Sequence, residues 1–137
     1  MSIVTREDAR IAVRTKVEAL RQTLAVDIEY DNIKTIDLSM QSKPYMKVCL
    51  EYMDGMQVDL GPNGYTRAIG VILLDVRVKP NTGTKDQNAI LEHFYRGLQK
   101  TDSMAPVRTL AARFDSAGVI DGWYSEAAVI PFWYDTQ

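Results

Sequence analysis

The chain has 137 residues, of which 46% are hydrophobic and 25% charged, with 16 basic and 18 acidic side chains. This length and composition are typical of one globular domain, so we expect a single domain over residues 1–137. The net charge of −2 offers no overall attraction to nucleic acid or anionic lipid. No apolar run approaches the ~20 residues that span a bilayer, and no hydrophobic signal segment begins the chain. A soluble protein without direct nucleic-acid or membrane partners is expected.

The first predicted element is an amphipathic helix over residues 5–24. It opens on a sequence typical of a capping box, Thr5 to Asp8. Apolar side chains then recur at steps of three and four, at Ala9, Val13, Val17, Leu20 and Leu24. The solvent side carries Arg6, Arg10 and Arg14. A solvated face is the simpler interpretation of these arginines, and contact with an acidic neighbouring subunit is the alternative.

Strand patterns follow the first helix. Residues 26–30 alternate as a short strand, and the polar segment 31–44 has no clear period. Loops of that length tend to be functional or mobile. Residues 45–52 alternate as a half-buried strand, and the Asp54-Gly55 turn before Val58 and Leu60 predicts a hairpin.

A long strand is predicted over residues 65–79, after the turn sequence Gly61-Pro62-Asn63-Gly64. Both of its faces are apolar at the centre, so both need cover. We expect it to be too long to sit wholly inside one small domain's sheet. The two helices of the chain suffice for one face, and a neighbouring subunit is the natural cover for the other. The second face carries Arg67, Ile69, Val71 and Leu73.

The C-terminal half begins with a second helix over residues 85–99, preceded by a second capping-box sequence, Thr84 to Gln87. Three short strands are expected after it, and Pro131 suits an edge strand or a bulge. The strands are predicted at 107–114, 118–124 and 127–134. This order of elements predicts an α+β fold, a mostly antiparallel sheet with two main helices packed on one face.

The sequence offers no strong catalytic signature. The single histidine, His93, has no second ligand at zinc spacing, and the single cysteine, Cys49, excludes an internal disulfide. A small enzyme would use Cys49, with His93 close to it in space, or a carboxylate pair. The candidate pairs are Asp121 with Glu126 and Asp37 with Asp59. With 18 acidic residues such pairs arise by chance, so we expect no enzyme, metal or cofactor.

Charge and aromatic residues favour assembly. Residues 1–24 carry five basic and three acidic groups, whereas residues 26–61 carry three basic and seven acidic groups. Opposed patches suit a head-to-tail contact that closes into a ring. The pairs Trp123-Tyr124 and Trp133-Tyr134 are each expected to place one ring inward and one outward, at a subunit contact, and base or sugar stacking is the alternative.

The order of these features resembles the tail-terminator proteins of long-tailed bacteriophages. The resemblance spans most of the chain and rests on the capped first helix, the long loop after Tyr30-Asp31-Asn32, the segment Leu60 to Val71, and Gly83 before the second helix. The strand from Tyr45 to Tyr52 and the closing Gly122-Trp123-Tyr124 and Pro131-Phe132-Trp133-Tyr134-Asp135 complete it.

This resemblance implies a structural subunit of the virion, made in the host cytoplasm and placed at the head-proximal end of the tail. It implies a homo-oligomeric ring, a hexamer, that caps the tail-tube protein and presents its other surface to head-completion or connector proteins. Arg67, Ile69, Val71 and Leu73 are then expected to face the adjacent subunit. Further contacts with the tube or the next copy are expected at Arg10, Arg14, Asp37 and Lys43. A head–tail connector or minor tail subunit of similar fold is the alternative.

Overall fold

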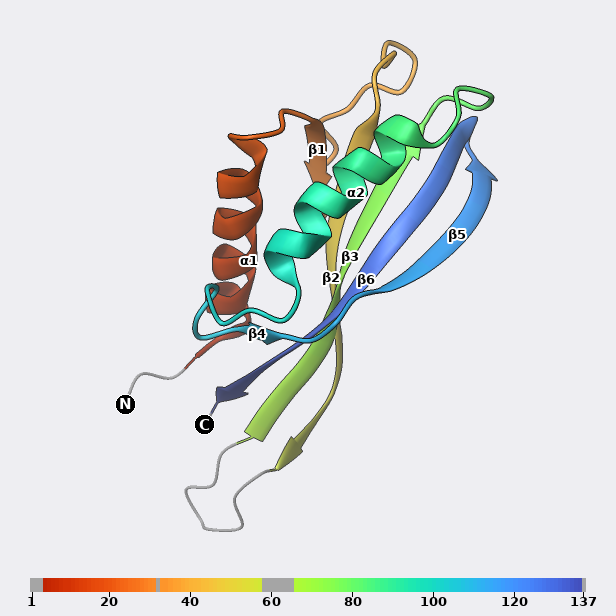
Figure 1. Cartoon of the computed structure of the whole chain (residues 1–137). Helices are drawn as coiled ribbons and strands as arrows, with labels where there is room; N and C mark the ends of the chain where they lie inside the picture. Colours follow the sequence, from red (N-terminus) through yellow and green to blue (C-terminus); the bar gives the residue numbers. More distant parts are fainter. Residues whose placement is uncertain (1–3, 32, 58–65, 137) are drawn as a thin grey trace.

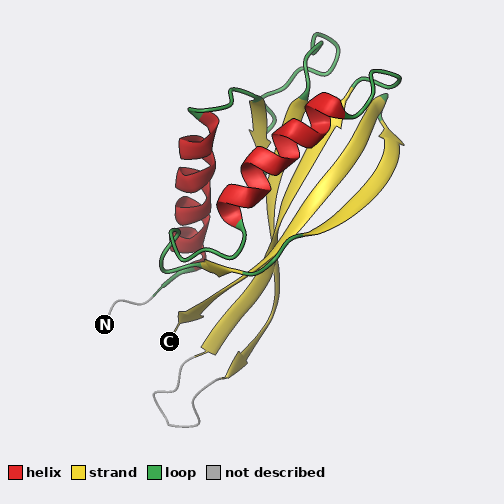
Figure 2. Cartoon of the chain, viewed as in Figure 1, coloured by secondary structure: helices red, strands yellow, loops and turns green. Residues whose placement is uncertain are grey.

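Two helices lie against one face of a six-stranded sheet in the computed structural model of the chain, which describes residues 4–31, 33–57 and 66–136 (Figure 1). The elements are α1 (Arg6–Arg21), β1 (Asp27–Tyr30), β2 (Tyr45–Gln57), β3 (Thr66–Val78), α2 (Lys85–Leu98), β4 (Arg108–Thr109), β5 (Arg113–Ile120) and β6 (Trp123–Thr136). The sheet order is β1-β2-β3-β6-β4, and β5 also pairs with β6. Only β1 and β2 are parallel. The predicted α+β fold is confirmed, and both helices lie on the same side (Figure 2).

Helix α1 begins as the sequence predicts. The Thr5 hydroxyl accepts a hydrogen bond from the Asp8 amide, and the Asp8 carboxylate accepts one from the Thr5 amide. This capping box satisfies two amides that have no partner within the helix. The helix ends at Arg21, three residues before the predicted end at Leu24. Neither α1 nor α2 has the length and apolar character that a membrane-spanning helix requires.

Helix α2 begins at Lys85 as predicted and ends at Leu98, one residue before the predicted end, but its capping box is not formed. The Thr84 side chain makes no cap hydrogen bond. Gln87 instead turns into the protein and is fully buried, and its Nε2 donates to the carbonyl oxygens of Val76 at 2.9 Å and Tyr124 at 3.2 Å. Gln87 therefore ties the start of α2 to the adjoining ends of β3 and β6, because burial gives these carbonyls no water to bond.

The main core lies between the helices and the sheet. Ala9, Val13 and Val17 of α1 and Phe94 and Leu98 of α2 are fully buried. They pack on the sheet face that carries Met46, Val48, Ile72, Leu74, Val76, Ala128, Ile130, Phe132 and Tyr134. The alternation of apolar residues along β2, β3 and β6 predicts this face correctly, because successive strand side chains point to opposite sides.

Strand β3 is paired over its whole length. Each residue from Thr66 to Val78 has a partner in β6, from Thr136 to Tyr124. Strand β2 runs along its other edge. The expectation that β3 is too long for one domain's sheet is therefore wrong, because β2 and β6 are equally extended. The length of β3 creates no need for a neighbouring subunit.

Strand β2 is longer than predicted. Asp54 and Gly55 do not form the predicted hairpin turn but lie within β2, where the register with β3 shifts between Met53 and Met56. A β-bulge of this kind bends a strand without ending it. The predicted turn at residues 61–64 and the residues 58–60 before it lie outside the described residues.

The three C-terminal strands also differ from prediction. The predicted strand at 118–124 contains a tight turn, because Asp121 and Gly122 have φ values of 52° and 80° between β5 and β6. β6 is one strand from Trp123 to Thr136. Pro131 lies inside this interior strand, opposite the irregular segment between β4 and β5, and its carbonyl accepts from Leu110. The missing N–H of Pro131 thus falls where the ladder is already interrupted.

The segment 31–44 is a crossover connection. Because β1 and β2 are parallel, the chain must return to the other end of the sheet between them. On the way it buries Ile36 against Tyr45 and Trp123, whose rings meet edge to face with centroids 4.9 Å apart. These two aromatic residues lie on the sheet face without helices. The long loop is therefore partly packed on its own domain.

Candidate interaction surface

One face of the sheet carries no helix in the part of the chain that the structure describes, and we call it the open face. Phe114 shows which side chains of β5 lie on this face. Its ring packs on Tyr95 of α2, with the ring centroids 5.0 Å apart, so Phe114 points to the helical side and its neighbours in β5 point to the open face. The strand registers then place side chains from four strands on the open face. They are Lys47, Cys49, Glu51 and Met53; Arg67, Ile69, Val71, Leu73 and Asp75; Ala127, Val129, Pro131, Trp133 and Asp135; and Arg113 and Asp115.

All four residues predicted for the subunit interface lie on the open face. Arg67, Ile69, Val71 and Leu73 follow one another on β3 and are all half-buried. Opposite them on β6 are the half-buried Asp135, Trp133 and Pro131 and the buried Val129. The centre of the open face is therefore an apolar surface that the chain covers only in part.

Arg67 is held by its own chain. Its guanidinium lies 4.0 Å from the centroid of the Trp133 ring and donates to the Asp135 carboxylate at 2.9 Å. The hydrogen bond to Asp135 raises the pKa of Arg67. Arg108 approaches the same ring at 5.5 Å. Tryptophan and arginine are enriched among the residues that dominate protein interfaces, so this stack makes the open face a candidate contact surface.

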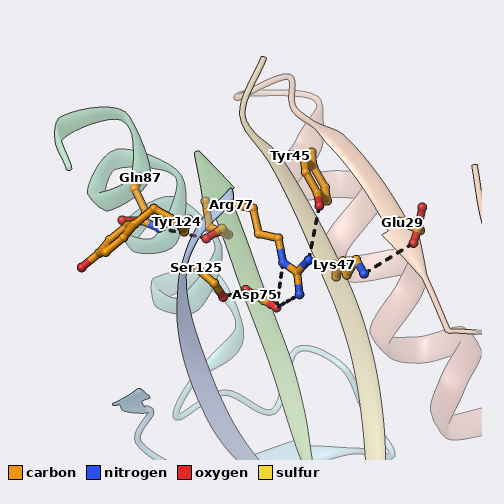
Figure 3. Close-up of polar contacts among 9 residues, drawn as sticks. Glu29, Tyr45, Lys47, Asp75, Arg77, Gln87, Tyr124 and Ser125 are labelled. Carbon is orange, nitrogen blue, oxygen red and sulfur yellow. Dashed lines mark hydrogen bonds and ion pairs between the residues drawn. The ribbon is translucent and has the colours of Figure 1, made fainter. Parts of the chain in front are cut away.

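A polar cluster occupies the opposite end of the open face (Figure 3). The Arg77 guanidinium donates to Asp75 at 3.2 Å and to the Tyr45 hydroxyl at 3.5 Å, and Asp75 also accepts from the Ser125 hydroxyl. Only 8% of the Arg77 side chain is exposed. Lys47 lies 4.0 Å from Glu29. Arg77 and Asp75 have partners within the chain, so they join β2, β3 and β6 and neither charge is free to meet a ligand.

The other predicted contacts do not join the open face. Arg10 pairs with Glu7 on α1, and Arg14 lies 4.5 Å from the centroid of the Tyr30 ring, so both lie in the helical layer. Asp37 and Lys43 lie in the crossover segment.

Asp37 and Lys43 make their contacts with residues of this chain that lie away from the apolar centre of the open face. The Asp37 carboxylate accepts from the amide and hydroxyl of Ser39, and these bonds lower its pKa. Lys43 lines a shallow groove of about 420 Å³ with Asp86 of α2 and Arg21 of α1. The structure therefore separates the predicted contacts into three regions.

The thiol-enzyme hypothesis fails on geometry. Cys49 lies on the open face, whereas His93 lies in the helical layer with its Nε2 2.7 Å from the Leu20 carbonyl oxygen. The sheet separates the two side chains. Burial, followed by the neighbouring Asp31, raises the pKa of Cys49 to about 12, so the sulfur is a neutral thiol at pH 7.

The carboxylates offer no metal cluster in the part of the chain that the structure describes, where no group of three or more histidine, cysteine, aspartate or glutamate side chains is placed to hold an ion. Of the predicted pairs, Asp121 lies in the β5–β6 turn and Glu126 points to the helical side of β6. Asp59 of the other pair lies outside the described residues.

Comparison with known proteins identifies the fold alone. No family model matches the chain, and no curated protein matches it. One solved structure, of a protein whose name is only a sequence identifier, aligns with 98% of this chain and 96% of its own, with a TM-score of 0.64 and 12% identity. The chain therefore shares its fold with that protein.

Sequence reasoning missed the contributions of the neighbouring strands to the open face. Glu51 and Met53 of β2 and Arg113 and Asp115 of β5 share it with the predicted β3 residues and with Trp133, the ring of its aromatic pair that points away from the core. Alternation within each strand identifies its two faces, but only the strand order and registers show which faces coincide.

Proposed function

We propose that this chain is a structural subunit of a bacteriophage virion that forms a homo-oligomeric ring on the end of a tail tube. The ring ends polymerisation of the tube and offers its opposite surface to head-completion or connector proteins. The observation that carries the proposal is the open face, a half-buried apolar surface flanked by Trp133 and Arg67. The sequence resemblance to tail terminators supplies the form and position of the assembly.

The physical case rests on what a neighbouring subunit would gain. Ile69, Val71 and Leu73 are still partly exposed, so a neighbouring subunit that covers them removes apolar surface from water. This burial stabilises the contact by roughly 25 cal/mol per Å². Arg67 is already oriented by Trp133 and Asp135, so little side-chain entropy is lost when a partner meets it. The protein in this role acts by binding, without cofactor or turnover.

The decisive experiment combines the purified protein with purified tail tubes. Light scattering after size-exclusion chromatography measures its mass, and negative-stain imaging locates it on the tubes. We expect rings at one end of each tube and an end to further tube growth. A protein that neither forms rings nor binds tubes contradicts the proposal. Binding to the head-side connector without affinity for tubes favours the connector alternative.

Arg67 and Asp135 provide a sharper test at the proposed interface. Arg67→Glu places two carboxylates side by side, so we expect it to reduce both tube capping and fold stability. The double variant Arg67→Glu/Asp135→Arg restores an internal pair of opposite polarity. If Arg67 meets a neighbouring subunit as a cation, the double variant folds normally but caps poorly. Normal capping by the double variant removes Arg67 from the interface.

A further inference from the structure

Four charged side chains surround the apolar centre of the open face. Lys47 and Glu51 lie on β2 at one side, and Asp115 and Arg113 lie on β5 at the other. The registers place Lys47 and Asp115 in one row across the sheet, through Asp75 and Ala127. On each side, one charge is positive and the other negative. The charge also changes sign across the sheet, from Lys47 on β2 to Asp115 on β5.

Three of these four charges are free to meet a partner. Glu51, Arg113 and Asp115 are exposed, and the ion pairs found among the described residues include none of them. Lys47 has 31% of its side chain exposed and only a distant contact with Glu29, at 4.0 Å. By contrast, the central charges Arg67, Asp75 and Arg77 pair within the chain.

A pattern of alternating charges is complementary to itself. When a second copy is turned over about a two-fold axis lying in the surface, positive corners meet negative corners. Between the corners, Cys49, Val71, Leu73, Pro131 and Ala127 are all half-buried, and a second copy of the same face would cover them. A partner with a uniformly charged surface would repel two corners, so the pattern favours a second copy of this chain over such a partner.

The crossover segment decides the direction of the axis. It lies over the end of the open face marked by Tyr45 and Trp123, where Ile36 packs on both rings. An axis along the strands would bring two crossover segments against each other and hold the faces apart. An axis across the strands places each crossover segment beyond the apolar centre, beside Met53 and Ile69 of the other copy. Both Met40 of the segment, at 80%, and Met53, at 62%, are highly exposed.

We propose that, away from the tail tube, two copies of this chain pack open face to open face with antiparallel strands. The two-fold axis crosses the sheet near the row of Cys49, Leu73 and Val129. Lys47 of each copy then faces Glu51 of the other, because the two residues lie equally far on either side of Cys49. Arg113 lies in the Cys49 row itself and Asp115 lies two residues from it, so an axis inclined from that row toward Phe114 brings Arg113 opposite Asp115. The dimer and the ring contact use the same face, so each excludes the other.

Sedimentation equilibrium of the purified protein at about 50 mM salt tests this dimer, since exposed charge pairs are only weakly screened there. We expect a reversible dimer that weakens as salt is raised. Glu51→Lys brings like charges together twice, once on each side of the axis, and we expect about a tenfold weaker dimer. Asp86→Lys, the same charge change on the helical layer, serves as the matched control and leaves the dimer unchanged.

The double variant Lys47→Glu/Glu51→Lys identifies the contact. The two residues lie ~13 Å apart along one strand and cannot pair within a chain. Recovery of the dimer by the double variant therefore requires a second, antiparallel copy. Recovery by Lys47→Glu/Asp115→Lys instead would overturn the antiparallel arrangement. Because Lys47→Glu places a carboxylate near Glu29, the exposed pair Arg113→Glu/Asp115→Lys repeats the test at the other corner, with Asp115→Lys as the disrupting variant.

The inference and the proposed function fail separately. A strictly monomeric protein at about 200 μM and low salt, or a dimer that ignores Glu51→Lys and Asp115→Lys, overturns the inference, since a contact of standard size would be populated there. Tube capping by such a protein would leave the proposed function intact. A charge-dependent dimer that does not cap tubes would support the inference and contradict the proposed function.

Discussion

At the scale of single residues, the surroundings of a side chain decide its chemistry. Cys49 is the only cysteine, and its sequence neighbours Lys47 and Glu51 do not indicate an unusual thiol. In the folded chain, burial and the nearby Asp31 raise its pKa to about 12. The surroundings also decide which residue fits at position 70, because a Cβ on Gly70 would lie 2.6 Å from the Phe132 ring.

The raised pKa of Cys49 predicts slow alkylation. At pH 8 the thiolate is the reactive form, and we expect iodoacetamide to modify folded Cys49 on the order of a hundredfold more slowly than Cys49 of the urea-unfolded chain. The folded chain holds the Cys49 thiol proton more tightly than the unfolded chain does. The contribution of this difference to the free energy of unfolding is therefore complete below pH ~8.5 and is lost as the pH rises toward 12. Mass spectrometry of quenched samples measures the rate, and equal rates in both states would contradict the prediction.

At the scale of elements, two similar capping sequences have different outcomes. Thr5 and Asp8 form their reciprocal hydrogen bonds in the exposed first turn of α1. Gln87 occupies the corresponding position in α2, but the carbonyls of Val76 and Tyr124 compete for its amide and prevail. A buried carbonyl without a partner costs about 1–3 kcal/mol, which exceeds the benefit of an exposed cap.

This difference predicts unequal effects of two matched substitutions. Thr5→Ala removes a cap hydrogen bond and should lower the free energy of unfolding by about 1 kcal/mol. Thr84→Ala removes no cap hydrogen bond and should have a clearly smaller effect. Urea denaturation followed by circular dichroism measures both variants. A larger effect at Thr84 would mean that its hydroxyl caps α2 in solution.

At the scale of the whole molecule, β3 presents two different faces through the alternating direction of its side chains. Leu74 is fully buried between the sheet and the helices, whereas Leu73 is half-buried on the open face. The two leucines are adjacent, so they share strand, backbone pairing and residue type. Any difference between their substitutions therefore reports the two faces of the sheet.

We expect Leu74→Ala to lower the free energy of unfolding by about 2–5 kcal/mol, as buried leucine truncations do. Leu73→Ala should cost less than Leu74→Ala, since the Leu73 side chain stays partly exposed, and it should weaken self-association and tube capping. Chemical denaturation at low protein concentration isolates the fold, and sedimentation or the capping assay measures assembly. Unchanged assembly in Leu73→Ala would exclude Leu73 from the contact.

The sequence by itself determined the two helices, the alternating strands and the α+β class, because hydrophobic period and capping residues act over a few neighbouring positions. It also identified Arg67, Ile69, Val71 and Leu73 as one face of a strand. Strand ends were less predictable. At Asp54-Gly55, pairing with β3 overrides the local turn preference, whereas at Asp121-Gly122 the turn preference prevails inside a predicted strand.

Only the tertiary structure decided what surrounds that face. Contacts between residues far apart in sequence placed Trp133 and Asp135 on Arg67, drew Gln87 into the core and laid Ile36 over Tyr45. The same registers brought Lys47, Glu51, Arg113 and Asp115 around one apolar centre. Strand order and register arise from the packing of the whole chain, so no local pattern encodes them.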